Sequence, residues 1–140
     1  MADRKSILAG VAYFGCVFAA GFALGALRTV LVVALVGETV AVALELPIIL
    51  AIAWIACRWL INRLEVPSRL VSRAVMGAVA FVLLMAGELS ISLLLAGRSA
   101  AEHLLLYWEA SHMLGLAGQL VFALFPVLQV RMNSDAQQGL

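Results

Sequence analysis

Four long apolar stretches constrain this chain more than any other feature of its sequence. They cover residues 7–27, 40–61, 74–96 and 104–130. An α-helix needs about 20 such residues to cross the hydrocarbon core of a bilayer. Because a backbone in lipid must satisfy its hydrogen bonds internally, each stretch is expected to be a helix. The sequence predicts an all-α, integral membrane bundle of four transmembrane helices, with residues 1–140 forming a single transmembrane domain.

The composition supports a membrane protein and excludes some other classes. The chain is 65% hydrophobic and 12% charged, whereas soluble domains are roughly 45 to 50% apolar and about 25% charged. The lipid bilayer is therefore an expected partner. No basic cluster with interleaved aromatic residues is present, so nucleic acid is not expected to bind. Cys16 and Cys57 lie in separate apolar stretches and predict neither a disulfide nor a zinc site.

The basic residues divide unevenly between the two sides of the predicted bundle. The side that holds both termini and the middle loop carries Arg4, Lys5, Arg58, Arg63, Arg69, Arg73 and Arg131. The other side carries only Arg28 and Arg98. Short cytoplasmic loops contain an excess of Lys and Arg, so both termini are predicted to be cytoplasmic. Tyr107 and Trp108, near the outer end, fit the aromatic belt of a membrane interface.

Some features of the first half of the chain leave alternatives open. Residues 29–37 are apolar but too short to span, and are compatible with an extension of the first helix, the start of the second, or an interfacial segment. The first stretch is longer than the usual apolar region of a signal peptide, which remains the alternative to a span. Its many small residues favour close packing within the bundle, with a homodimer interface as the alternative.

Five of the eight acidic residues lie in or beyond the outer half of the predicted bundle. They are Glu38, Glu45, Glu88, Glu102 and Glu109. Glu38 and Glu45 are seven residues apart, which places them only about 20° apart around one helix. The same spacing predicts that Glu102 and Glu109 are in line on the last helix.

On that last helix, His112 is predicted about 60° from Glu109, with Gln119 in line with His112. Counting depth along three antiparallel helices brings four groups to a similar level: Glu45, Glu88, Glu109 and His112. Charged groups at such depth cost several kcal/mol unless they are paired. These four are the candidate cation or proton site, and the supporting polar residues are Arg28, Glu38, Arg98, Glu102 and Gln119. The structural alternative is that the glutamates only hydrogen-bond helices together.

Three functions of different kinds agree with this pattern. The first is binding or transport of a proton or a metal cation. The Glu109-x-x-His112 spacing is typical of half a di-metal site, so a divalent metal held there would require a homodimer. The second is a membrane-embedded enzyme acting on a lipid or a quinone, although no nucleophile motif or phosphate loop supports one. The third is a non-catalytic accessory or assembly subunit that meets partner membrane subunits.

The order of several short motifs gives one further indication. The chain has a glycine-rich first span, then Gly37-Glu38, Glu45-Leu46-Pro47, Arg58-Trp59, Glu88 and Gln119. In this order it resembles a group of small four-span bacterial inner-membrane proteins of unknown function. The resemblance implies a multi-pass protein of a bacterial inner membrane, and it implies no residue roles.

Overall fold

The computed structural model describes the backbone of residues 2–139 and the side chains of residues 3–132 and 139. Every element in this part of the chain is a helix. The elements are α1 (Ala2–Leu27), η1 (Arg28–Val32), α2 (Val33–Val36), α3 (Glu38–Arg63), α4 (Leu70–Leu94), α5 (Ala100–Leu106) and α6 (Ala110–Gln138). Four helical segments are long and apolar enough to cross a membrane: Asp3–Val36, Glu38–Arg63, Leu70–Leu94 and Ala110–Met132. The predicted all-helical bundle with four such helices is confirmed.

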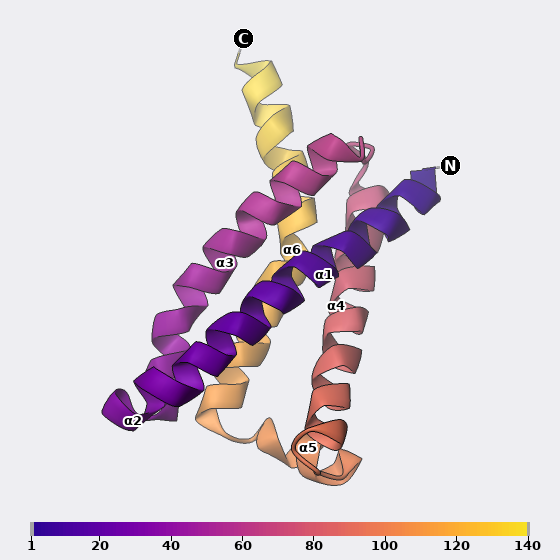
Figure 1. Cartoon of the computed structure of the whole chain (residues 1–140). Helices are drawn as coiled ribbons and strands as arrows, with labels where there is room; N and C mark the ends of the chain where they lie inside the picture. Colours follow the sequence, from indigo (N-terminus) through magenta and orange to yellow (C-terminus); the bar gives the residue numbers. More distant parts are fainter. Residues whose placement is uncertain (1, 140) are drawn as a thin grey trace.

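The four long helices form a bundle in which α1 and α6 each pack against both α3 and α4. Both termini and the α3–α4 connection lie at one end, which we call the terminal end (Figure 1). The α2 and α5 segments lie at the other end, here called the distal end. Seen as in Figure 1, α3 and α4 diverge toward the distal end, so the bundle is wider there.

The segment after the first span extends that span. Residues 28–32 form one π-helical stretch, in which the Val33 N–H donates to the Arg28 carbonyl, and α2 continues in the same helical run. The run ends at Gly37, whose φ is 83°. Glycine adopts this left-handed conformation without a steric penalty, and the chain turns there into α3.

The last long helix begins later than the sequence predicts. Residues 100–106 form the separate helix α5, which starts with a capping box between Ser99 and Glu102. The N–H groups of Tyr107, Trp108 and Glu109 then bond to carbonyls three residues earlier, a tight turn that ends this helix. Because α6 starts only at Ala110, Glu102 and Glu109 do not lie in line on one helix with His112. Leu104, Leu105 and Leu106 precede this turn directly, so hydrophobicity alone does not show that one helix ends there and another begins.

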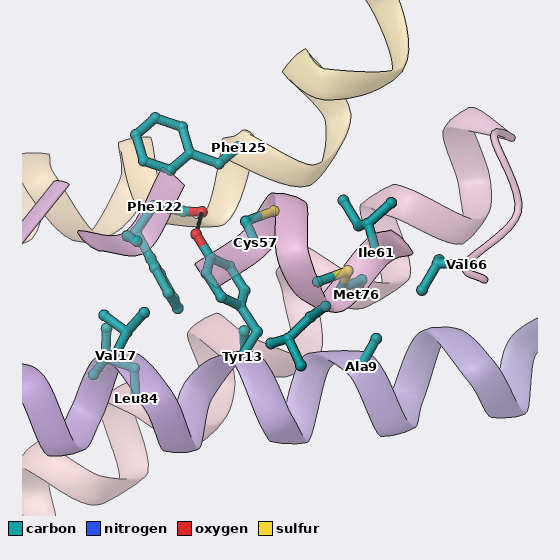
Figure 2. Packing of buried hydrophobic residues seen from close by; sticks show 13 residues of the cluster. Ala9, Tyr13, Val17, Cys57, Ile61, Val66, Met76, Leu84, Phe122 and Phe125 are labelled. Carbon is teal, nitrogen blue, oxygen red and sulfur yellow. Dashed lines mark hydrogen bonds between the residues drawn. The ribbon is translucent and has the colours of Figure 1, made fainter. Parts of the chain in front are cut away.

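The hydrophobic core lies in the half of the bundle nearer the terminal end. Figure 2 shows Tyr13 of α1 pointing at Phe122 of α6, with Cys57 of α3 and Met76 of α4 beside them. The Tyr13 and Phe122 rings stack with their centres 4.3 Å apart. A second aromatic contact, Trp54 against Phe125, extends this packing. This core joins all four long helices.

Small residues allow the closest helix contacts. A Cβ added to Gly77 would lie 2.1 Å from the Ala123 carbonyl oxygen, and one added to Gly10 would lie 2.7 Å from that of Met76. Close packing within the bundle therefore explains Gly10. A Cβ at Gly15 would meet nothing within 4 Å, so the packing within this chain does not require that glycine.

Arg73 has a structural role at the terminal end. Its side chain is 1% exposed. Its Nε donates to the Pro67 carbonyl at 3.1 Å, and its Nη2 to the Val66 carbonyl at 3.3 Å. The guanidinium thus fixes the α3–α4 connection onto the first turn of α4.

Candidate functional site

Two neighbouring cavities occupy the distal half of the bundle. The larger, which we call the large cavity, has a volume of about 570 Å³ and lies among α1, η1, α3, α4 and α6. Its walls are apolar or glycine except for five residues: Arg28, Thr29, Glu45, Glu88 and Gln119. The small cavity has a volume of about 320 Å³. Three of the five polar residues of the large cavity also line the small one: Arg28, Glu88 and Gln119. The candidate polar residues therefore border space within the bundle.

Arg28 and Glu45 form an ion pair across the large cavity wall. The Nη1 of Arg28 lies 3.2 Å from Oε2 of Glu45, and the side chains are only 25% and 16% exposed. The contact is close, although it is not aligned as a hydrogen bond. Arg28 stands at the start of the π-helical segment, a conformation often found at functional sites. The charge of Glu45 is thereby compensated within the chain.

Glu88 of α4 has a different environment. The amide Nε2 of Gln119 donates to its Oε1, and the hydroxyl of Tyr107 donates to its Oε2 at 3.5 Å. Both donors are uncharged. Among the described residues, Glu88 takes part in no ion pair. Its carboxyl group is hydrogen-bonded but meets no group of opposite charge within the described part of the chain.

Tyr107 connects Glu88 to His103 in the small cavity. Its hydroxyl lies 3.5 Å from Nε2 of His103, and the two rings meet edge to face. A phenol has one proton, so when Tyr107 donates to Glu88, its contact with His103 is a hydrogen bond only in the tautomer that carries a hydrogen on Nε2. Burial, with the nearby Glu88 charge as a lesser cause, raises the pKa of Tyr107 above its ordinary value. The sequence places Tyr107 only in an aromatic belt, because nothing local in it links this tyrosine to Glu88.

Glu109 and His112 form a pair outside the large cavity. Nδ1 of His112 lies 3.5 Å from Oε2 of Glu109 and 3.3 Å from the Ser111 hydroxyl. His112 borders the small cavity, whereas Glu109 is 57% exposed and borders neither. Residues 3–132 contain no group of three or more His, Cys, Asp or Glu side chains arranged to hold a metal ion. The pair offers two donors, fewer than a protein metal site uses.

The remaining polar residues divide between the small cavity and the helix ends. Glu38 and Arg98 line the small cavity. Glu102 accepts from the Ser99 N–H at 2.7 Å in the capping box of α5, so its contact is structural. The structure thus places Glu45, Glu88 and Gln119 around one cavity, with His112 beside the next one and Glu109 apart from both.

The fold and these cavities define a class of protein: an all-helical chain with four potential membrane spans and, between them, a mainly apolar cavity that five polar residues help to line. Comparison with known protein families, curated proteins and solved structures finds no match to this chain.

Proposed function

We propose that this chain is a multi-pass protein of a bacterial inner membrane that binds a proton or another cation at Glu88. The excess of basic residues at the terminal end supports an orientation with both termini cytoplasmic. In that orientation the large cavity lies in the outer half of the membrane.

The observation that carries this proposal is the contrast between two glutamates of the large cavity. Glu45 is paired with Arg28 at 3.2 Å, whereas the partners of Glu88 among the side chains that the structure describes are the neutral donors Gln119 and Tyr107. An unpaired charge inside a membrane costs several kcal/mol, which favours uptake of a proton or a cation. Glu88 is therefore the group of the cavity that gains most from binding one.

A second feature supports a partner for Glu88. The amide Oε1 of Gln119 is buried and has no hydrogen-bond donor among the described residues. An unsatisfied buried acceptor costs about 1 to 3 kcal/mol. The N–H of a cationic ligand would provide the missing donor, and a carboxylic acid proton on Glu88 would do so once the Gln119 amide turns its oxygen toward the carboxyl group. Either form of occupancy would therefore satisfy Gln119 as well as Glu88.

Infrared difference spectroscopy on the purified protein tests the proposal. Between acid and alkaline buffer, the wild type should show a carboxylic acid C=O band that is absent from Glu88→Gln. Glu109→Gln is the matched control, because Glu109 is half-exposed and borders neither cavity. A difference spectrum of Glu88→Gln that equals the wild-type spectrum would overturn the assignment to Glu88.

A further inference from the structure

We infer that the large cavity binds a lipophilic amine, with its protonated nitrogen at Glu88 and its apolar body against the cavity walls. The inference rests on the proposed cation site and names the class of ligand. It is carried by the size of the cavity, its charge, and the polar side chains of Glu88 and Gln119 in its lining.

The size of the large cavity exceeds what a bare ion requires. Ligand cavities for small molecules measure roughly 300 to 1,000 Å³, and this one measures about 570 Å³. Gly115 contributes to its wall, yet a Cβ there would meet nothing within 4 Å. This glycine therefore leaves space open and is not required for helix contact. An organic molecule fits the volume, whereas a proton or a metal ion would leave it unfilled.

The charge of the cavity selects for a cation. One arginine, Arg28, faces two glutamates, Glu45 and Glu88, so one negative charge is left over. An anionic ligand would meet this excess and lose affinity, whereas a cation would neutralise it. Phe18 and Phe22 also line the cavity. Aromatic rings add to the binding of organic cations.

The polar residues of the lining favour an amine over other cations. Glu88 and Gln119 both line the cavity, and the buried Oε1 of Gln119 has no hydrogen-bond donor among the described residues. A protonated amine carries N–H groups that can donate to carboxylate and amide oxygens, which a quaternary ammonium lacks. The apolar remainder of the lining then suits a hydrocarbon body.

Three probes that share one apolar body test the ligand class. Aminoadamantane is a cation at neutral pH, adamantanol is neutral and adamantane carboxylate is an anion. Binding is measured by saturation-transfer NMR on the full chain in lipid nanodiscs, with empty nanodiscs subtracted. We expect the amine to bind at least about tenfold more tightly than the alcohol, as for one charge-assisted hydrogen bond, and the carboxylate not to bind. Equal binding of the three probes would overturn the inference.

Two variants locate the binding site. Glu88→Gln should reduce amine affinity by about tenfold or more through loss of the charge-assisted hydrogen bond. Gly115→Leu should reduce it by filling the large cavity, while it keeps the infrared band of Glu88. Gly15→Leu is the matched control, since Gly15 has equal free space and borders neither cavity.

The outcomes separate this inference from the proposed function. An infrared band from Glu88 without amine binding would leave the cation site in place and overturn the amine. Amine binding that Gly115→Leu leaves unchanged would place the amine elsewhere and also overturn the inference. If the infrared band persists in Glu88→Gln and this variant still binds the amine, both the proposed cation site and the amine inference are overturned.

Discussion

The hydroxyl of Tyr13 donates a hydrogen bond to the carbonyl oxygen of Phe122, 2.9 Å away, across the interface of α1 and α6. That carbonyl lies four residues before Pro126, which has no N–H to bond it within the helix. Pro126 is almost fully buried, so water does not reach this site to donate the missing hydrogen bond. The tyrosine of one helix thereby completes the hydrogen bonding of another.

This relationship gives a double-mutant prediction. Tyr13→Phe keeps the ring stacking and leaves the Phe122 carbonyl unsatisfied, which should lower the free energy of unfolding by about 1 to 2 kcal/mol. Pro126→Ala restores an N–H within α6, so the tyrosine change should cost less in that background. Unfolding in mixed micelles measures all four variants. Equal costs of Tyr13→Phe in both backgrounds would show that the hydroxyl does not replace the missing helical donor.

Loss of one partner of the Arg28–Glu45 pair should lower the free energy of unfolding more than loss of both partners. Arg28→Gln leaves Glu45 as an unpaired, mostly buried charge and should cost roughly 2 to 4 kcal/mol. The double variant Arg28→Gln with Glu45→Gln removes both charges and should regain most of the lost stability. Thermal unfolding in nanodiscs provides the measurement, and a double variant as unstable as the single one would contradict the prediction.

An exposed pair provides the control for that experiment. Nζ of Lys5 lies 3.2 Å from Oε2 of Glu65 at the terminal end, and the two side chains are 49% and 81% exposed. Lys5→Gln should change stability by no more than about 1 kcal/mol, because water screens such pairs.

The contact of Gly77 with α6 should not tolerate a methyl group. A Cβ at this position would lie 2.1 Å from the backbone oxygen of Ala123, so α4 and α6 would have to separate. Gly77→Ala should therefore lower stability by about 1 to 3 kcal/mol. Gly15→Ala, with free space around its Cβ, should be neutral or slightly stabilising because alanine favours helix. Similar losses in the two variants would contradict this account of the contact.

The titration of Tyr107 should report the charge on Glu88. The chain has two tyrosines, so Tyr13→Phe leaves Tyr107 as the only one. Absorbance of the tyrosinate should then give a pKa above the ordinary value of 10.0, because burial and Glu88 both disfavour the anion. Adding Glu88→Gln should lower this pKa, but not to 10.0, since burial remains the larger cause. A pKa unaffected by Glu88→Gln would place the glutamate away from the phenol.

Much of this fold could be predicted from the sequence because membrane spans depend on local hydrophobicity and length. The second and third predicted spans agree with α3 and α4 to within a few residues. The first predicted span lies within α1, which starts earlier, and the same helical run continues through η1 and α2. The fourth predicted span began too early, because the turn after Leu106 follows directly on the apolar residues 104–106. Helix α6 starts at Ala110 and continues to Gln138, beyond the predicted end at Val130. Averaged hydrophobicity does not detect hydrogen bonds of this kind.

The sequence by itself determined an all-helical chain with four potential spans and acidic residues concentrated toward one half, because both properties are written in residue type and spacing. Only the tertiary structure decided that Arg28 compensates Glu45, that Glu88 has neutral partners, and that Glu109 lies apart. These outcomes depend on which side chains meet across helices. Contacts such as Tyr13 with Phe122 join residues 109 positions apart, and helix packing alone brings them within hydrogen-bond distance.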